Sequence, residues 1–233
     1  MIISHKHKYI FLKTTKTAGT SIEIALSQYC GPDDVITPIS PEDEAIRREL
    51  GFRGPQNFVV PLNKYRLKDW AYLFGSGKRL KFQNHNPASF VRKWTGDEVW
   101  NNYFVFCFER NPYDKAISRY YWSTRRSERP HINDYLHAVP RNALSNWHIY
   151  TIDDAVAVDF VGGYERLNAD LKYVWEKLQL PSEPNLPRAK GDHRVDRRHY
   201  SEVLDVQARA LVTEVCAREI AQFGYEFKSS IES

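Results

Sequence analysis

Two segments that lie far apart in the sequence share one pattern: an apolar run, a short polar loop and a helix-like run. In the first, the loop Lys13–Ser21 follows the strand-like run Tyr9–Leu12 and precedes Ile22–Leu26, which has helical character. In the second, Glu109–Ser118 follows Asn102–Phe108, an aromatic and β-branched run typical of a buried central strand. A repeated order of strand, loop and helix predicts an α/β fold with a central, mainly parallel sheet flanked by helices.

The first loop contains residue types that suit an anion. Gly19 allows another group to approach the backbone closely, and Thr17, Thr20 and Ser21 add hydroxyl donors around it. Lys16 adds a mobile positive charge beside a helix start, where backbone N–H groups favour anions. A capped helix start with a solvated lysine has the same composition, so this loop alone leaves both interpretations open.

The second loop follows the strand that we expect at the centre of the sheet. Asn111 can cap the next helix, Pro112 suits its first turn, and the helical pattern continues to Trp122. Because ligands bind at the carboxyl ends of parallel strands, Arg110 is placed to fork onto a phosphate, with Ser118 adding a hydroxyl. The alternative is a structural ion pair between Arg110 and a neighbouring carboxylate. Two such loops suggest a ligand with two separate phosphate-type groups.

At this point the residues resemble a known family. Lys16–Ser21 and Arg110–Ser118 resemble the 5′-phosphosulfate loop and the 3′-phosphate motif of sulfotransferases that use 3′-phosphoadenosine 5′-phosphosulfate (PAPS), in particular the carbohydrate-type sulfotransferase family 2. Three further matches lie at Phe82–His85 with Pro87–Ser89, at Gly163–Leu167 with Asp170, and at Phe223–Phe227. The resemblance covers nearly the whole chain, so it implies a single sulfotransferase domain over residues 1–233 with a P-loop-NTPase-like fold.

The resemblance also implies roles for individual residues. Lys16 would stabilise the charge that grows on the bridging oxygen as the sulfuryl group leaves, and the nucleotide product would be 3′-phosphoadenosine 5′-phosphate (PAP). The residues that would contact the nucleotide are Thr17, Ala18, Gly19, Thr20 and Ser21 at the 5′-phosphosulfate, Arg110 and Ser118 at the 3′-phosphate, and Lys190 and Arg194 in a loop that closes over it. The acceptor would be a hydroxyl, in this family that of a carbohydrate, with a small metabolite as the alternative.

A general base must take the proton of the acceptor hydroxyl. The candidate is His85, because it follows an expected strand, Leu80–Gln83, and because an ordinary histidine titrates near neutrality. Glu109 is the reserve candidate, although we expect the neighbouring Arg110 to lower its basicity.

Two other functions use the same residues. A P-loop kinase or NTPase would need the Walker A order G-x-x-x-x-G-K-[ST], whereas here Thr15 precedes the lysine and Gly19 follows it. The central strand ends in Glu109 and Arg110 rather than in the aspartate that holds magnesium, and we expect no metal. A non-catalytic protein that binds a nucleotide or an anionic glycan is the second alternative.

Composition limits the partners. Lysine and arginine exceed aspartate and glutamate by 33 to 29, a net charge of only +4, so nothing indicates nucleic-acid binding. The three cysteines are widely spaced and odd in number, which favours free thiols in a reducing compartment. No targeting segment and no apolar run long enough to span a membrane is evident. We therefore expect a soluble, cytoplasmic enzyme without a membrane partner; the acceptor's identity and the oligomeric state are not readable from the sequence.

Three segments outside these motifs carry further expectations. Residues 31–66 are an excursion after the first helix, either acceptor-binding or a surface segment, and contain a charged helix over Pro41–Leu50. Val203–Phe223 has helical spacing and is expected to be one C-terminal helix. The basic residues near Arg125 are either a solvated surface or contacts for an anionic acceptor.

Overall fold

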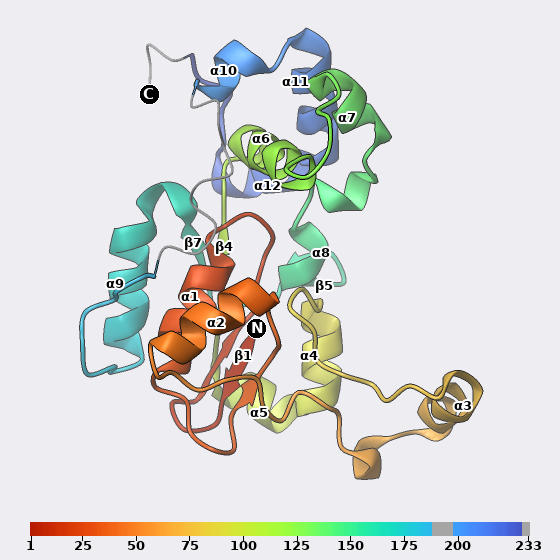
Figure 1. Ribbon diagram of the computed structural model, residues 1–233, viewed down its shortest axis with the longest axis vertical. Coiled ribbons are helices and arrows are strands. Elements are labelled where there is room, and N and C mark those ends of the chain that lie inside the picture. The colour runs from red at the N-terminus through yellow and green to blue at the C-terminus, as the bar shows by residue number, and fades with distance from the viewer. Residues whose placement is uncertain (188–197, 230–233) are drawn as a thin grey trace.

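A computed structural model describes residues 1–187 and 198–229 and places a five-stranded sheet at the centre of the molecule, with helices on both sides (Figure 1). The strand order is β3-β1-β2-β4-β7. The strands are β1 (Ile2–Ser4), β2 (Tyr9–Phe11), β3 (Val35–Ile36), β4 (Phe104–Glu109) and β7 (Phe160–Gly163), and a separate two-stranded sheet pairs β5 (Thr151–Ile152) with β6 (Ala155–Val156).

The part of the sheet formed by β2, β4 and β7 is parallel. Strand β4 pairs in parallel with β2 on one side and with β7 on the other, whereas β1 runs antiparallel to both of its neighbours. The expected central, mainly parallel sheet flanked by helices is confirmed. Because β2 and β4 are adjacent and parallel, the two loops that follow them meet at one edge of the sheet.

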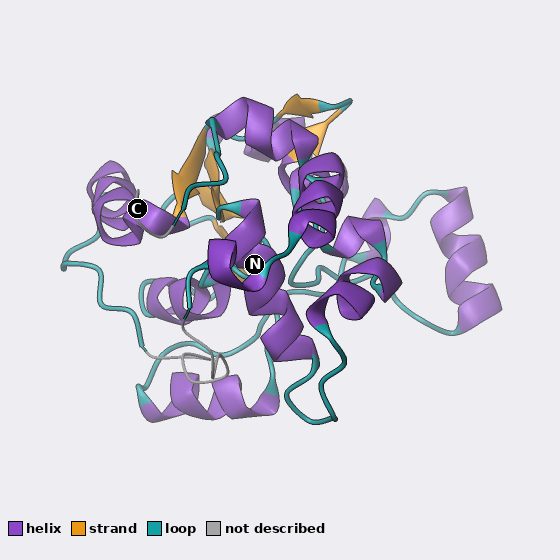
Figure 2. Ribbon diagram, turned by 90° about the horizontal axis from the view of Figure 1, so that it is seen from above, coloured by secondary structure: helices purple, strands orange, loops and turns teal. Residues whose placement is uncertain are grey.

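The helices form three groups, each around its own apolar cluster. On one face of the sheet α1 (Gly19–Ser27) and α9 (Leu167–Lys177) pack, and on the other α4 (Ala88–Thr95), α5 (Asp97–Asn102) and α8 (Trp147–Tyr150). Beyond the carboxyl end of β4 lie α6 (Pro112–Ser123), α7 (Ile132–Ala138), α10 (Tyr200–Val203), α11 (Val206–Val215) and α12 (Ala217–Phe223) (Figure 1). The remaining helices are α2 (Pro41–Glu49) and α3 (Leu67–Ser76); α3 stands apart from the body of the molecule in both ribbon views (Figure 2).

Alternation along the inner strands explains why both faces of the sheet are covered. In β4, Phe106 and Phe108 join the cluster under α1 and α9, while Val105 and Cys107 join the cluster under α4 and α5. All four side chains are essentially inaccessible to solvent. A strand buried on both faces reads as continuously apolar, which is the pattern that predicted it.

The structure confirms most of the expected elements. Strand β2, helix α1, strand β4, helix α6 and helix α2 lie where the sequence predicted them, and the cysteines Cys30, Cys107 and Cys216 are buried free thiols. Strand β1 was not anticipated, because its apolar part is short and polar residues follow at once. Among the described residues, no helix has the length and apolar character needed to cross a membrane.

Two expected elements are wrong. Leu80–Gln83 is not a strand, since only Lys81 forms an isolated bridge, to Val59, before the chain turns into the His85 loop. Val203–Phe223 is not one helix either. Asp205 accepts a hydrogen bond from the backbone N–H of Ala208 at 2.9 Å and starts α11 anew, and Cys216 leaves helical geometry between α11 and α12.

The excursion over residues 31–66 does not stay on the surface. Arg47 of α2 is completely buried and reaches Glu23 of α1, with 3.5 Å between its Nη2 and the Oε1 atom of the carboxylate. Beyond α2, the chain leaves the body to form α3 and returns at Lys81.

Glu23 is the centre of a buried ionic cluster. Its carboxylate lies 2.7 Å from Lys13 Nζ and 2.9 Å from the terminal amino group of Met1, and it accepts a hydrogen bond from the Thr37 hydroxyl. Burial alone would raise the pKa of Glu23, but the positive charges of Met1, Lys13 and Arg47 outweigh it and lower the pKa from 4.5 to about 2. One side chain thus joins β1, the end of β2, α1 and α2.

We predict that Glu23→Gln strongly destabilises the fold, because it leaves the buried ammonium of Lys13 without its carboxylate and removes one of the two carboxylates beside Arg47. Removing one partner of a buried ion pair costs about 3–5 kcal/mol, and urea denaturation should show a loss in that range. Because the pKa of Glu23 is lower in the folded state than in the unfolded chain, its contribution is present at neutral pH and is lost as the pH falls from about 4.5 towards 2.

The control is Glu49→Gln on α2, where the side chain is exposed and the expected change is within about 0.5 kcal/mol. Equal stability of the Glu23 and Glu49 variants would contradict the central position of Glu23.

Candidate functional site

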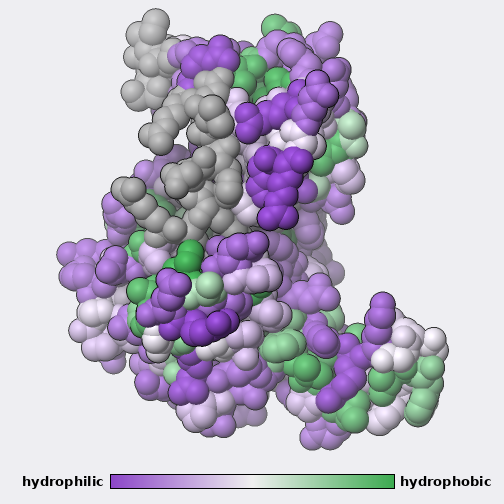
Figure 3. Space-filling model, in the orientation of Figure 1, coloured by the Kyte–Doolittle hydropathy of each residue, from purple (hydrophilic) through white to green (hydrophobic). Residues whose placement is uncertain are grey.

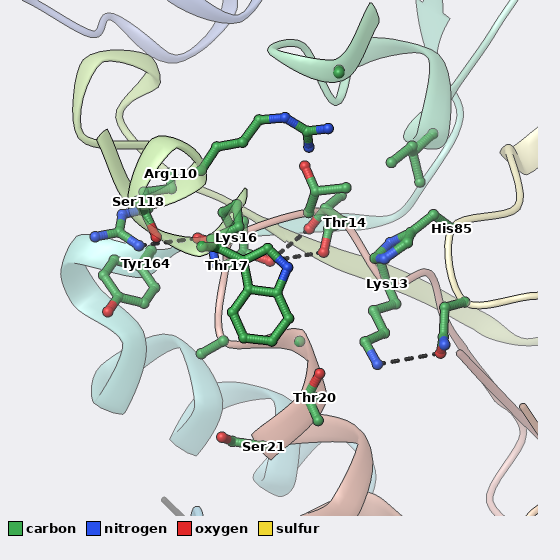
Figure 4. Close-up of a pocket in the computed structure, with 18 of the residues that line it drawn as sticks. Lys13, Thr14, Lys16, Thr17, Thr20, Ser21, His85, Arg110, Ser118 and Tyr164 are labelled. Atoms are coloured by element: carbon green, nitrogen blue, oxygen red, sulfur yellow. Dashed lines mark hydrogen bonds between the residues drawn. The ribbon is translucent and has the colours of Figure 1, made fainter. Parts of the chain in front are cut away.

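A pocket of about 730 Å³ lies at the carboxyl ends of β2 and β4. Nine residues expected in the site line it: Lys16, Thr17, Ala18, Gly19, Thr20, Ser21, His85, Arg110 and Ser118. In the close-up view, Arg110, Ser118 and Tyr164 stand on one side, His85 on the other, and Lys16 and Thr17 between them (Figure 4). Lys190 and Arg194 lie outside the described residues.

The loop before α1 has a special backbone. Lys16 and Ala18 both adopt positive φ angles, 63° and 59°, which non-glycine residues seldom do. A Cβ atom on Gly19 would lie 2.8 Å from Cγ of Lys13, so a larger residue would have to displace that buried side chain. Loops of this kind can turn successive N–H groups towards one point, and the positive end of the α1 dipole faces the same pocket.

Hydrogen bonds attach this loop to the neighbouring strand. The Thr14 hydroxyl donates to the backbone carbonyl of Phe108 in β4 and lies 2.8 Å from the Thr17 hydroxyl. Both threonines are buried. The loop is therefore attached to β4 through Thr14 and is braced internally by the contact between Thr14 and Thr17.

Asn146 holds the loop from the other side and was not predicted from the sequence. Its Oδ1 accepts hydrogen bonds from the backbone N–H of Thr15 at 2.9 Å and from the Thr15 hydroxyl at 2.7 Å. Its Nδ2 donates to the Thr15 carbonyl and to Glu109 Oε1, each at 3.1 Å. Because Asn146 is completely buried, all of these bonds are shielded from water.

Behind Asn146 lies a second buried ionic cluster. Lys115 Nζ lies 3.0 Å from Glu109 Oε1 and 3.8 Å from Glu219 Oε1, and Glu219 accepts the backbone N–H of Asn146 at 3.0 Å. Burial raises the pKa of Glu109, although Lys115 opposes the shift. The sequence predicted the opposite direction, from Arg110, whose side chain turns instead to Asp114. Glu109 does not line the pocket, so it is a support for the loop rather than the reserve base.

Arg110 forms the structural ion pair that was one of its two interpretations, and it lines the pocket. Its Nε atom lies 2.8 Å from Oδ2 of Asp114, and the two side chains form an ion pair. It also donates to the Lys16 carbonyl at 3.1 Å and lies 4.0 Å from the ring centre of Tyr164, all at the pocket wall. These contacts hold the guanidinium in place at the second loop and tie that loop to the first.

Three further pocket residues escaped the sequence analysis. Arg119 follows Ser118 on α6, and its Nε is buried with no hydrogen-bond partner in the described part of the chain. The Trp122 ring, one turn further on, lies 4.9 Å from Lys16 Nζ. Trp122 lies four residues after Ser118 on the same helix, so helical spacing could have found it, and Arg119 lies three residues before Trp122. Nothing in the sequence links Tyr164 to Arg110, because their contact depends on the pairing of β4 with β7.

The geometry of His85 makes its ring a proton acceptor. Nδ1 lies 2.7 Å from the Lys13 carbonyl, and since a carbonyl only accepts, Nδ1 carries the hydrogen and Nε2 is left with a lone pair. Burial lowers the pKa of His85 from 6.5 to about 4, although the bond to Lys13 opposes the shift. One side of the residue remains open to solvent, which limits the size of this effect, but its direction keeps the ring neutral at pH 7.

Residues 1–187 and 198–229 contain no group of three histidine, cysteine, aspartate or glutamate side chains that could hold a metal ion. The chemistry that these described residues themselves offer is hydrogen bonding, positive charge and a neutral imidazole.

Comparison with known proteins gives one family and one relative. The chain matches the model of the sulfotransferase family over residues 1–226. An uncharacterized protein of Archaeoglobus fulgidus is 36% identical over 103 residues, which cover 42% of this chain and 85% of the relative. No solved structure matches the chain. Because the family match extends over all of the elements that build the pocket, the chain belongs to the sulfotransferase family.

Proposed function

We propose that this sulfotransferase moves a sulfuryl group from PAPS to a hydroxyl of a carbohydrate, and that its fold is of the P-loop-NTPase-like class. The observation that carries the proposal is that one pocket brings together the loop around Lys16, the Arg110 and Ser118 pair, and a neutral His85. The first two suit the two ends of a nucleotide with separate anionic groups, and the third suits an acceptor hydroxyl.

The residues present fit such a nucleotide. Arg119 lines the pocket, and its buried Nε has no protein acceptor among the described residues. An unsatisfied buried donor is costly, and an anionic oxygen would satisfy it. Ser118 and the fixed guanidinium of Arg110 supply further donors on the same wall, where we place the 3′-phosphate.

A second, smaller pocket of about 570 Å³ supports a carbohydrate acceptor. It shares Asn84 and His85 with the main pocket and continues past Gln83, Asn86 and the aromatic rings of Phe58 and Phe82. Amide side chains both donate and accept, as sugar hydroxyls do, and aromatic rings offer an apolar surface to a sugar face. The base candidate thus lies where the donor and acceptor spaces join.

The proposed chemistry needs positioning and charge rather than a covalent intermediate. PAPS supplies an activated sulfuryl group whose sulfur–oxygen bond to the 5′-phosphate breaks as the acceptor oxygen bonds to sulfur. His85 Nε2 takes the acceptor proton. The Lys16 ammonium, the N–H groups of the loop and the α1 dipole stabilise the negative charge left on the phosphate side.

The test of the function is calorimetric titration of the protein with PAP, beside ATP with magnesium. We expect micromolar or tighter binding of PAP and weak binding of ATP. Arg110→Ala should weaken PAP binding by about 10–100-fold, because a charge-assisted hydrogen bond contributes about 1.5–3 kcal/mol. Arg119→Ala should also weaken PAP binding.

The control for both variants is Arg48→Ala, an exposed arginine of α2 outside the pocket. A preference for ATP with magnesium would indicate a kinase or NTPase instead, and no affinity for either nucleotide would refute the proposed donor.

The second prediction concerns protonation of His85. Because burial lowers its pKa, the ring should titrate below its usual value near 6.5 in an NMR titration, with the signal assigned by its absence in His85→Gln. The base is active when unprotonated, so its protonation should not reduce sulfuryl transfer until the pH falls well below 6. A His85 pKa at or above 6.5 would contradict the assignment, as would normal turnover of His85→Gln.

The third prediction concerns Asn146 as a positioning residue. Asn146→Ala removes the four hydrogen bonds that hold Thr15 and Glu109, so the loop should lose its binding geometry and PAP affinity should fall by about tenfold or more. Lys16→Ala, by comparison, should lower turnover far more than PAP affinity.

A double-mutant cycle separates positioning from general destabilisation. Thr15→Val removes the hydroxyl that Asn146 accepts, so the effects of the two substitutions on PAP affinity should be non-additive. Asn168→Ala, at an exposed position of α9, serves as the control. Strict additivity of the Asn146 and Thr15 effects would show that Asn146 does not act through the Thr15 hydroxyl.

A further inference from the structure

Residues 62–81 form an arm that projects from the body of the protein. The arm contains a short 3-10 helix (Leu62–Lys64), α3 and the returning segment to Lys81. Figure 1 shows α3 far from the sheet, beyond α4, and Figure 2 shows the same separation from a second direction. The arm therefore presents α3 to the surroundings as a convex protrusion.

One face of α3 is apolar and exposed. Leu67 and Phe74 are 91% and 81% accessible, and the exposed Ala71 lies between them at helical spacing. Trp70 stacks on Phe74 with 5.9 Å between ring centres, which extends the apolar surface. Apolar surface gathers over the arm in the space-filling view (Figure 3).

This exposure is concentrated on the arm. Seven large apolar side chains are exposed in the described part of the chain, and four of them, Leu62, Leu67, Tyr72 and Phe74, belong to residues 62–81. Single exposed apolar residues need no explanation, but a contiguous patch marks an interaction surface.

The arm also carries the positive charge of the protein. Residues 62–81 contain six basic residues and one acidic residue, a net charge of +5, whereas the whole chain has +4. The rest of the chain is thus slightly acidic. The basic residues are Lys64, Arg66, Lys68, Lys78, Arg79 and Lys81.

The single acid of the arm does not offset this charge at its surface. Asp69 is buried, accepts the backbone N–H of Arg66 at 3.0 Å, and lies 3.7 Å from Lys93 of α4. It acts as an internal cap of the helix and as a tie to the body. The arm therefore exposes apolar and basic side chains, whereas its one acid is buried.

We propose that this arm docks on an anionic lipid surface, with Leu67 and Phe74 entering the boundary between headgroups and acyl chains. A helix with a leucine and aromatic face and flanking basic residues has the character of an interfacial helix. Each lysine or arginine near an anionic membrane adds about 1 kcal/mol of attraction. A bilayer also accepts a convex protrusion without needing a complementary groove.

The charge pattern argues against a second copy as the occupant. Pairing two arms along their apolar faces would bring two sets of basic residues together, and like charges across an interface are unfavourable. The sequence-based expectation of no membrane partner considered only spanning segments, and an interfacial helix needs no such segment.

Vesicle co-sedimentation without nucleotide tests the proposal. The full chain should bind vesicles of phosphatidylcholine mixed with phosphatidylglycerol and not those of phosphatidylcholine alone. Binding should weaken when NaCl rises from about 0.1 M to about 1 M, because the Debye length falls from about 10 Å to about 3 Å. The triple variant Lys68→Gln, Lys78→Gln, Arg79→Gln should lose about 100-fold in partitioning.

The apolar contribution is tested by Leu67→Gln with Phe74→Gln, which should lower partitioning at least about tenfold. Matched controls are Val206→Gln, an 82% exposed apolar residue on α11, and Lys172→Gln with Lys177→Gln, exposed on α9; none should change binding. Urea denaturation checks that each variant is folded, and PAP titration checks the nucleotide site separately.

Equal binding to both vesicle types, no binding to either, or equal losses in arm and control variants would overturn the proposal. So would a concentration-dependent dimer, measured by sedimentation, that Phe74→Gln dissociates, because a second copy would then cover the apolar face.

Discussion

The pocket depends on one buried carboxylate, Glu23. It fixes the ammonium of Lys13 at 2.7 Å, and Lys13 in turn does two things for the site. Its carbonyl orients the His85 ring, and its side chain lies where any residue larger than Gly19 would have to be accommodated. Because an unpaired charge in the interior is far more costly than an exposed one, this arrangement tolerates little variation. The Glu23–Lys13 ion pair therefore stabilises the fold and holds the side chain that lies against Gly19, and the backbone carbonyl of the same Lys13 sets the tautomer of the candidate base.

The two buried ionic clusters divide the support of the loop between them. Glu23 supports the start of the loop through its ion pair with Lys13. The cluster of Glu109, Lys115 and Glu219 supports the middle of the loop through Asn146, which bonds to Glu109 and to Thr15. Between these anchors, Lys16 and Ala18 keep the positive φ angles that isolated residues would avoid. Strain at a binding loop persists only where the surroundings determine it, and here hydrogen bonds to Thr14 and Thr15 provide that constraint.

Local patterns in the sequence predicted the parts of the site that lie within one segment. Such parts could be predicted from their own residue types, without knowledge of what they contact in the fold. They are the Lys16–Ser21 loop and Arg110, which line the pocket, and the strand β4. The parts that failed depend on contacts between distant segments. Asn146 bonds directly to Thr15 although the two residues are 131 positions apart in the sequence, and the expected strand at Leu80–Gln83 is replaced by the base of the arm. Burial, rather than the nearest charge, decided the pKa of Glu109, and burial is not visible in a local pattern.

Charge is used in opposite ways at the site and on the arm. At the site, the supporting cations have carboxylate partners: Lys13 with Glu23, Lys115 with Glu109, and Arg110 with Asp114. Such buried pairs are screened little by salt, so the pocket should keep its geometry over a wide range of ionic strength. On the arm, the one acid is buried, and exposed basic residues share the surface with exposed apolar side chains. Their attraction for an anionic surface is exposed to counterions. A rise in ionic strength should therefore weaken binding of the arm to an anionic lipid surface and leave the geometry of the pocket unchanged.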